Sequence, residues 1–340
     1  MEHRLSVCAA SGFVTRCLTI RRVCNPLFNA QRTTCPLAAQ AVSLCSIPGC
    51  VIFSVTMGTI LWKVGGHALD LSAHALIMGV LNVTPDSFSD GGKFFAADKA
   101  IEQGKRMAAA GAAIIDVGGE STRPGAEAIS ADEEIARVIP VIEQLRGNFP
   151  GFISIDTSKA AVARAALDAG ATIINDVTAG RADPEMFGLA AERKAGIVLM
   201  HMQGTPRTMQ AAPRYDDVVR EVAYFFRQQY ERALECGVDA MAIAFDPGIG
   251  FGKTVEHNLA LLANLERLRV DDRPLVVGVS RKSSLGKMIG SNAMEDRLAP
   301  TIACTALLRE RGANVLRVHD VKENVAALRI TEAFLKTTAP

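Results

Sequence analysis

The chain has 340 residues, of which 49% are hydrophobic and 21% charged, and its formal net charge at pH 7 is +1. This is the composition of a globular protein long enough for one large domain or two small ones, and the near-neutral charge gives no indication of a nucleic-acid or acidic-lipid partner. Aromatic residues are few at 5%, and the 28 glycines suit parallel α/β packing better than a β-sandwich.

The first 60 residues differ from the rest of the chain. They contain five arginines, no lysine and one acid, Glu2, and no helical or strand period persists in them. Such an arginine-rich, acid-poor stretch has the composition of an organelle transit peptide. A translation start placed too early, with Met57 as the real start, is the interpretation we favour, and a genuine extra segment is a third possibility. We expect residues 1–60 to be a disordered extension.

An apolar run at residues 50–62 is too short to span a bilayer. We therefore expect no transmembrane helix, no membrane partner and a cytoplasmic protein. Residues 60–71 predict a small hairpin that turns at Gly65 and Gly66 and leads into the main domain, residues 61–340.

From residue 76 onward, short apolar runs alternate with amphipathic, alanine-rich segments. The runs predict strands at residues 76–81, 113–117, 152–155, 172–175, 197–200, 241–245, 275–279 and 314–318. The segments between them predict helices at residues 96–110, 131–146, 159–169, 185–194, 216–236, 256–268, 296–311 and 322–336. Eight strands alternating with eight helices within about 260 residues predict a (β/α)8 TIM barrel. The alternative is an open doubly wound sheet.

Polar side chains follow every one of the eight predicted strands. They are Asn82; Asp116; Asp156; Asn175 and Asp176; His201; Asp246; Ser280, Arg281 and Lys282; and Arg317 and His319. Turn formation explains one such residue but hardly all eight ends. In a barrel the carboxyl ends of the strands lie on one side and hold the site, so these residues predict a binding site there.

Four of these residues form the first candidate constellation: Asp156, Asn175, Asp246 and Lys282. Buried carboxylates are costly unless they are paired or hydrogen-bonded. Lys282 can pair with one of them, and the other can accept the paired N–H donors of a flat heterocycle. The alternative is a structural ion-pair network at the barrel mouth. Asp176 points the other way on its strand, and we favour a structural role for it.

Arg317 and His319 flank Val318 at the end of the last strand. Strand alternation places both on one face, and phosphate sites in barrels often lie after the last two strands. The pair is therefore interpreted as an anion clamp in which Arg317 supplies a planar fork. A packing or helix-start histidine is the alternative for His319.

The loops at residues 83–94 and 118–129 are polar and glycine-rich. The carbonyl oxygen of Asn82 can ligate a hard cation, with phosphate oxygens and waters completing the shell, and Thr122 and Arg123 can reach a carboxylate or phosphate. The run GIGFGKT at residues 248–254 is not a phosphate loop, because Pro247 occupies its first glycine position. We expect it to shape the rim, with Phe251 and Lys253 lining the site.

Eight motifs in order give the chain a specific resemblance. They are IMGVLNVTPDSFSDGG, IIDVGGESTRPGA, SIDTSKA, INDVTAG, MHMQGTPRTMQ, FDPGIGFGK, GVSRKSS and RVHDV. Together they resemble the dihydropteroate synthases, from about residue 61 to the C-terminus. The resemblance implies a homodimeric, Mg²⁺-dependent transferase of folate biosynthesis (EC 2.5.1.15). Such an enzyme joins 6-hydroxymethyl-7,8-dihydropterin diphosphate to 4-aminobenzoate, giving 7,8-dihydropteroate and diphosphate.

The resemblance also implies roles for single residues. The pterin pocket would be formed by Asp156, Asn175, Asp246 and Lys282, with Met202 as an apolar wall. Diphosphate would bind at Arg317 and His319 and Mg²⁺ at Asn82, with Val318 also counted among the substrate-binding residues. The 4-aminobenzoate site, where sulfonamides compete, would comprise Phe251, Lys282 and Ser283 with the loop of Thr122, Arg123 and Pro124. Asp156, Lys282, Arg317 and His319 would be the catalytic residues.

The implied chemistry needs no nucleophilic side chain, because the arylamine attacks the pterin methylene carbon. Breaking the C–O bond puts charge on diphosphate, so stabilising that charge is the main task. Arg317, His319 and Mg²⁺ would perform it, and Asp156 would favour a cationic pterin.

Two features depart from the family pattern, and two other functions stand as alternatives. Ala113 stands where the family more often has an acid, and residues 1–60 have no recognised counterpart. A methyltetrahydrofolate methyltransferase would keep the pterin acids but would not need the RVH or TPDSFSDGG segments. A catalytically silent homologue would be indicated by loss of Lys282 or Arg317, and both are present.

Overall fold

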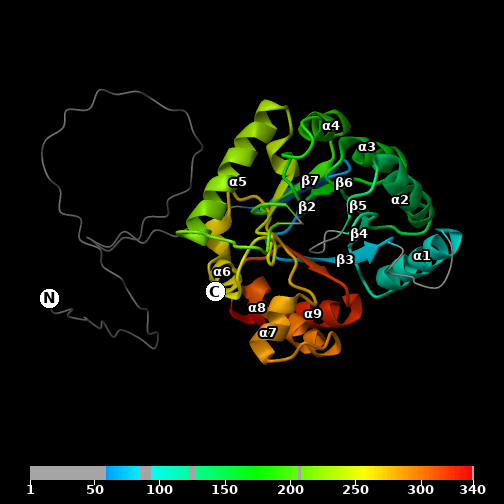
Figure 1. Cartoon of the computed structure of the whole chain (residues 1–340). Coiled ribbons are helices and arrows are strands. Elements are labelled where there is room, and N and C mark those ends of the chain that lie inside the picture. The colour runs from blue at the N-terminus through cyan, green and yellow to red at the C-terminus, as the bar shows by residue number, and fades with distance from the viewer. Residues whose placement is uncertain (1–58, 85–92, 122–126, 206–207, 339–340) are drawn as a thin grey trace, which may run out of the picture. The chain divides into compact units, whose positions relative to one another are not determined.

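The computed structural model describes residues 59–84, 93–121, 127–205 and 208–338 (Figure 1). All of the predicted extension except residues 59 and 60 lies outside these ranges. The described part opens with strands β1 (Leu61–Val64) and β2 (His67–Asp70), which pair antiparallel. This is the predicted hairpin, with its turn at Gly65 and Gly66.

Eight parallel strands follow and form a ring. They are β3 (Leu76–Asn82), β4 (Ile114–Gly118), β5 (Phe152–Asp156), β6 (Ile173–Asp176), β7 (Gly196–Met200), β8 (Ile243–Asp246), β9 (Val276–Val277) and β10 (Val315–Val318). Hydrogen bonds join them in the order β8-β7-β6-β5-β4-β3-β10-β9. A further parallel bridge between Phe245 and Leu275 connects β8 to the start of β9 and closes the ring. The predicted (β/α)8 barrel is therefore confirmed, and the open sheet is excluded.

Helices surround the ring (Figure 1). They are α1 (Lys93–Ala109), α2 (Ala131–Arg146), α3 (Ala160–Asp168), α4 (Met186–Arg193), α5 (Val218–Glu235), α6 (Val255–Ala263), α7 (Ser283–Ile289), α8 (Leu298–Glu310) and α9 (Val321–Thr338). Ser130 caps α2 by accepting from the N–H of Glu133, and Asp217 caps α5 in the same way. None of the described helices is long and apolar enough to cross a membrane.

Two helical predictions differ from the structure. Helix α7 was not predicted, because its seven residues include Gly286 and two serines, which are weak helix formers. The helix predicted at residues 256–268 ends at Ala263, and a separate 3-10 turn, η3 (Leu265–Leu268), follows Asn264. Asparagine competes for backbone hydrogen bonds and favours such a break.

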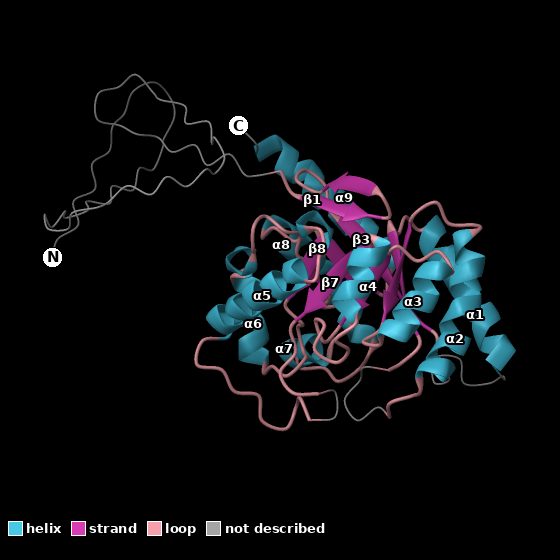
Figure 2. Ribbon diagram, turned by 90° about the horizontal axis from the view of Figure 1, so that it is seen from above, coloured by secondary structure: helices cyan, strands magenta, loops and turns pink. Residues whose placement is uncertain are grey.

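The hairpin seals the N-terminal end of the barrel. Trp62 is fully buried, and its Nε1 donates to the carbonyl of Ala242 at 2.9 Å. It packs in one apolar cluster with Met78, Ile114 and Ile173 inside the ring. Figure 2 shows β1 at the end opposite the long loops, so the single tryptophan is remote from the carboxyl ends of the strands.

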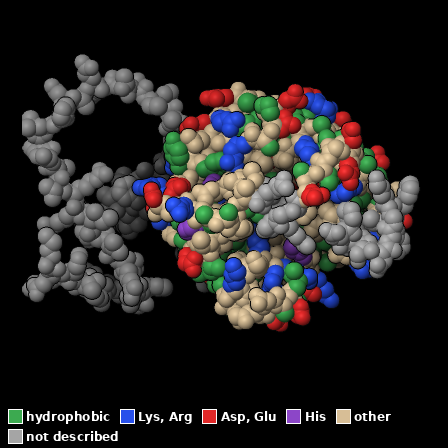
Figure 3. Space-filling model, viewed as in Figure 1, with side chains coloured by type: hydrophobic (Ala, Val, Ile, Leu, Met, Phe, Trp, Pro, Cys, Tyr) green, Lys and Arg blue, Asp and Glu red, His purple; other side chains and the backbone are tan. Residues whose placement is uncertain are grey.

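The barrel interior changes from apolar to polar along each strand. In β4, Ile114 belongs to the apolar cluster, Asp116 lies one layer further on, and Gly118 ends the strand. Side chains two residues apart face the same way. The strands therefore carry polar groups into the half of the ring that lies nearest their carboxyl ends. The alternate residues Ile115 and Val117 pack outward into the larger core beneath the helices. On the face drawn in Figure 3, acidic and basic side chains are interspersed.

Candidate active site

Neighbouring strands place polar residues side by side at the open end of the barrel. The register pairs Asn82 with Gly118, Gly118 with Asp156, and Asp156 with Asn175. Because paired positions on neighbouring strands face the same side, the side chains of Asn82, Asp156 and Asn175 converge although they are far apart in sequence. The structure thus brings together residues that the sequence predicted as separate strand ends.

Arg317 connects Asp156 to the more deeply buried carboxylate of Asp116. Its Nε donates to Oδ2 of Asp116 at 2.7 Å, and its Nη2 donates to Oδ2 of Asp156 at 2.6 Å. Asn175 donates from Nδ2 to the same oxygen of Asp116 at 3.0 Å. Asp116 is fully buried, and its Oδ1 has no hydrogen-bond partner among the described residues. One guanidinium and one amide therefore share a single buried carboxylate oxygen.

Burial controls the ionisation of Asp156. Loss of water raises the pKa of this carboxyl, Arg317 lowers it, and the nearby charge of Asp116 raises it again, which leaves the pKa at about 7. The same two carboxylates hold the pKa of Arg317 above its usual value although burial opposes this. Arg317 is therefore a permanent cation, whereas Asp156 changes charge near neutral pH.

Lys282 and Asp246 form the opposite side of the mouth. Asp246 accepts the N–H of Gly248 on Oδ1 at 2.7 Å. The ammonium of Lys282 donates to the carbonyl of Ile249 and lies 4.8 Å from the ring centre of Phe251. Burial raises the pKa of Asp246 and lowers that of Lys282 to about 8. The ion pair expected between Lys282 and a carboxylate does not form among the described residues, because a loop carbonyl takes the ammonium instead.

His319 is held as a neutral imidazole. Burial and the neighbouring arginines lower its pKa to about 4. Its backbone N–H donates to the hydroxyl oxygen of Ser280 at 3.1 Å, and its Nδ1 lies 3.0 Å from the same oxygen. Either atom can supply the proton of this contact; when the hydroxyl donates to Nδ1, the proton of the ring lies on Nε2. His319 can thus offer a neutral N–H donor to an anion.

Val318 lies between the two clamp residues but faces away from them. Its side chain is buried in the core beneath the helices, because strand alternation turns it outward. The sequence predicted Val318 as a substrate-binding residue, and only its backbone remains available for such a contact.

Methionines form an apolar wall beside the polar groups. Met202 is buried in a small cluster with Val177, Met200 and Met209, and Phe251 packs against it. Flexible thioether side chains make favourable contacts with aromatic rings. This wall can accommodate the face of a flat heterocycle whose edge meets the carboxylates.

Gly118 lies between Asn82 and Asp156 at the strand ends. A methyl group at Gly118 would make van der Waals contact with Oδ1 of Asn82 at 3.7 Å and with Oδ2 of Asp156 at 3.8 Å, so glycine leaves these two oxygens uncovered. In the described ranges, no group of three or more histidine, cysteine, aspartate or glutamate side chains could hold a metal ion. Asn82 can therefore offer a cation one oxygen, and a bound substrate would have to supply others.

The structure also locates other residues that the sequence singled out, of which Lys253 lies elsewhere than expected. Asp116 was noted at a strand end but not assigned to the site, because only the register reveals that Arg317 reaches it. Lys253 was expected at the rim and is instead only 3% exposed. Asp176 has the structural role expected for it, since it accepts from Thr178 and Gly180 and stabilises a turn outside the ring. Ser283 is exposed at the start of α7. Thr122, Arg123 and Pro124 lie outside the described residues.

Comparison with known proteins gives a consistent result. Residues 78–319 match the family described as pterin binding enzyme. The dihydropteroate synthase of Escherichia coli (strain K12) is 48% identical over 270 residues, which cover 79% of this chain and 95% of that protein. The Xanthomonas albilineans dihydropteroate synthase solved with 4-aminobenzoic acid has a TM-score of 0.77 at 43% identity, covering 83% of this chain and 100% of the other. The Yersinia pestis enzyme solved with a sulfonamide drug complex has a TM-score of 0.76 at 44% identity, with coverage of 82% and 100%.

Proposed function

This chain belongs to the dihydropteroate synthase family of pterin-binding enzymes, and we propose that the polar groups at the open end of its barrel carry out the family's reaction. The enzyme is a transferase of folate biosynthesis (EC 2.5.1.15) that joins 6-hydroxymethyl-7,8-dihydropterin diphosphate to 4-aminobenzoate. The products are 7,8-dihydropteroate and diphosphate. The observation that carries the residue assignment is the convergence of Asp156, Asn175 and Arg317 on one point at the strand ends.

The pterin is held by its edge and its face. Asp156, Asn175 and Asp246 accept the N–H groups along the ring edge, and Lys282 donates to a ring acceptor. Support comes from burial, since Asn175 and Asp246 are each only 5% exposed, and a buried hydrogen-bonding edge discriminates strongly against ligands that cannot match it. Met202 supplies the apolar face.

Diphosphate departs toward Arg317 and His319. Two nitrogens of Arg317 are occupied by Asp116 and Asp156, so its Nη1 is the atom that turns to the leaving group. His319 adds the Nε2–H donor that its neutral tautomer leaves free. Donors fixed in advance stabilise charge as it develops on the leaving oxygen. Asp156 in its ionised form favours positive charge on the pterin methylene carbon while the C–O bond breaks.

The arylamine approaches from the side of Phe251. Phe251, Lys282 and Ser283 surround the open side of the pocket, and the aminobenzoate ring packs on Phe251 while Lys282 and Ser283 meet its polar ends. The amine nitrogen attacks the methylene carbon and loses its proton after the bond forms. A sulfonamide carries the same aniline group and would compete for this position.

Mg²⁺ is the proposed cofactor. Mg²⁺ prefers oxygen ligands and is commonly bound by one or two protein groups together with substrate phosphates. The carbonyl oxygen of Asn82, at a strand end beside Gly118, can supply one ligand of such a shared site. When bound, Mg²⁺ would neutralise charge on the diphosphate oxygens, and Asn82 orients its amide oxygen toward them.

The enzyme works as a homodimer in the cytoplasm. Helices α8 and α9 lie side by side and carry exposed apolar side chains, with Leu307 49%, Ile330 62% and Phe334 68% exposed. Large exposed apolar side chains on neighbouring elements are typical of interaction surfaces. Both cysteines in the described part of the chain, Cys236 and Cys304, are free thiols, which suits a reducing compartment.

The test is diphosphate release by protein beginning at Met57 and by the full chain. Pterin diphosphate and Mg²⁺ are supplied with and without 4-aminobenzoate, and with and without a sulfonamide. Release that depends on aminobenzoate and is blocked by the sulfonamide is expected from both proteins. Release by the full chain alone would make the first 56 residues part of the enzyme. No release by either protein, with pterin still bound, would favour the silent homologue.

A further inference from the structure

Lys253 lies inside the protein in an unusual environment. Its Nζ is 3.0 Å from the carbonyl oxygen of Gly248, 2.9 Å from that of Phe251 and 3.2 Å from that of His201. The Nδ1 atom of His201 is also within 3.0 Å. Among the described residues no carboxylate forms an ion pair with this ammonium. Three carbonyl dipoles and an imidazole therefore replace both water and a counterion.

The four acceptors come from two different loops. His201 begins the loop after β7, and Gly248 and Phe251 belong to the loop after β8. The two loops also touch directly, because a side chain at Gly248 (φ 63°) would lie 2.0 Å from the carbonyl oxygen of His201. Only glycine allows this approach. Lys253 thus binds two loops at their point of closest contact.

The loop after β8 positions the groups on one side of the pocket. The N–H of Gly248 holds Asp246, the carbonyl of Ile249 holds Lys282, and the ring of Phe251 lies beside the same ammonium. A shift of this short segment would therefore move groups that contact both proposed substrates.

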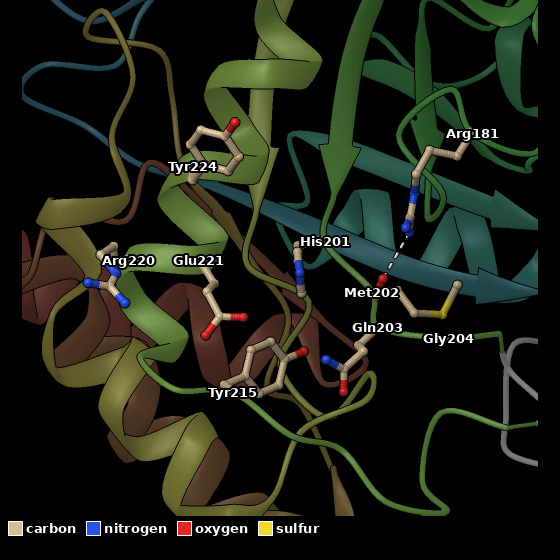
Figure 4. A pocket seen from close by; sticks show the side chains of 9 residues that line it. All are labelled: Arg181, His201, Met202, Gln203, Gly204, Tyr215, Arg220, Glu221 and Tyr224. Atoms are coloured by element: carbon tan, nitrogen blue, oxygen red, sulfur yellow. Dashed lines mark hydrogen bonds between the residues drawn. The ribbon is translucent and has the colours of Figure 1, made fainter.

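The loop after β7 borders a cavity. The cavity has a volume of about 520 Å³ and is lined by Arg181, His201, Met202, Gln203, Gly204, Tyr215, Arg220, Glu221 and Tyr224 (Figure 4). Figure 4 shows the hydrogen bond from Arg181 to the carbonyl of Met202 across this space, at 2.9 Å. On this side the loop is held by that hydrogen bond and by the packing of the His201 ring against Phe225 and Tyr215.

The protonation behaviour of Lys253 and His201 is compatible with a permanent contact between them. Burial and the cations Lys253 and Arg181 lower the pKa of His201 to about 2, so the imidazole stays neutral and can accept. Burial, with Lys282 and Arg181, lowers the pKa of Lys253 to about 7, although Asp246 raises it. In either protonation state the lysine nitrogen retains N–H donors for these acceptors.

We propose that Lys253 is a positioning residue, whose side-chain nitrogen ties the loop of His201 and Met202 to the loop of Gly248 and Phe251. It thereby places Phe251 and Lys282 for the attack of the aminobenzoate on the pterin. This inference rests on the proposed function of the site. Lys253 itself touches neither substrate.

The test is Lys253→Met, which keeps the length of the side chain and removes its donors. In the folded variant, kcat/KM for 4-aminobenzoate should fall about 100-fold, the effect of a displacement near 1 Å. Fluorescence of Trp62, at the other end of the barrel, reports folding separately. Lys63→Met is the matched control, since Lys63 lies at that same far end and pairs only with Asp239 at its surface; its kcat/KM should be unchanged.

A folded Lys253→Met enzyme with wild-type kcat/KM would overturn the proposal. If Lys253→Met does not fold, the variant His201→Phe tests the proposal instead. It removes the Nδ1 acceptor and keeps the aromatic packing against Phe225. A fall of about tenfold in kcat/KM would support positioning, whereas an unchanged value or another failure to fold would refute it. An inactive wild-type enzyme would instead count against the proposed function.

Discussion

The Nε of Arg317 donates to Oδ2 of Asp116 at 2.7 Å, inside the half of the barrel nearest the carboxyl ends of the strands. Asp116 is fully buried, and the same oxygen orients Asn175. It therefore supports two residues with different proposed tasks, one toward diphosphate and one toward pterin. A side chain that touches no substrate can in this way govern both binding sites.

We expect Asp116→Asn to impair pterin diphosphate binding. The amide keeps the shape of the carboxylate but loses the charge that holds Arg317, and it places an N–H₂ group against a guanidinium or an amide. Titration calorimetry should show affinity for pterin diphosphate reduced about tenfold or more, in line with the 1.5–3 kcal/mol of a hydrogen bond to a charged group.

Asp176→Asn provides the control for that variant. Asp176 is equally buried, but it stabilises a turn outside the ring. The change should lower the free energy of unfolding by about 1–3 kcal/mol and leave pterin affinity unchanged. Equal losses of affinity in both variants would show that the effect of Asp116 is general destabilisation.

The pKa values of Asp156 and Lys282 predict a bell-shaped pH profile. Asp156, whose pKa is raised to about 7, carries its required charge only above that pH. Lys282, whose pKa is lowered to about 8, loses its required proton above that pH. Since kcat/KM reports the free enzyme, it should rise with pH through about 7 and fall through about 8.

Two variants assign the limbs of this profile. Asp156→Asn should remove the acid limb together with most of the turnover. Lys282→Arg should move the alkaline limb upward, because a guanidinium keeps its proton. If Asp156→Asn binds substrate normally and keeps both its turnover and the acid limb, the electrostatic role of Asp156 is wrong.

The sequence predicted most of the fold because each barrel unit carries its own signal. Residues 76–81 are continuously apolar, as a strand buried on both faces must be, and Asn82 ends that run. Helix α7 escaped prediction because its pattern is short and contains Gly286. It begins at Ser283, and Lys282 before it makes, among the described residues, no side-chain capping hydrogen bond that the sequence could have signalled.

The site was predictable as a set of strand ends but not as a set of contacts. Alternation along a strand indicates which way Arg317 points, yet only the register across the ring shows that it meets Asp116. The burial of Lys253 had no sequence signal either, because a lysine in a glycine-rich loop usually faces water. Its environment arises from carbonyls of two loops that the sequence cannot bring together.

Asn82→Ala tests the cation site. Loss of the amide oxygen should raise the Mg²⁺ concentration that gives half-maximal activity about tenfold, within the range expected when a metal-site group is removed. Chelation of Mg²⁺ should abolish diphosphate release by the unmodified enzyme. Asn148→Ala is the control, because the exposed amide of Asn148 donates to the carbonyl of Gln144 at the end of α2. An unchanged Mg²⁺ requirement in Asn82→Ala would remove Asn82 from the site.

Phe334→Glu tests the proposed dimer surface. Phe334 is 68% exposed on α9, and a carboxylate there would be buried without a partner if two chains meet at this surface. Light scattering after size-exclusion chromatography should show a dimer for the wild type and a monomer for the variant. Tyr224→Glu, at an equally exposed position on α5, should remain dimeric. A dimer that persists in Phe334→Glu would place the interface elsewhere.

The measurement that tests the assignment of the pterin pocket most directly is the affinity of pterin diphosphate for Asp246→Asn. Asp246 is 5% exposed and its Oδ1 already accepts from Gly248, so the variant alters the proposed pterin edge with little change of shape. Calorimetry without aminobenzoate should show binding weakened at least tenfold, as expected when a charged hydrogen-bond acceptor is lost. Asp239→Asn, on the surface near the far end of the barrel, should bind like the wild type. Equal affinity in Asp246→Asn and the wild type would contradict the assignment of the pterin pocket.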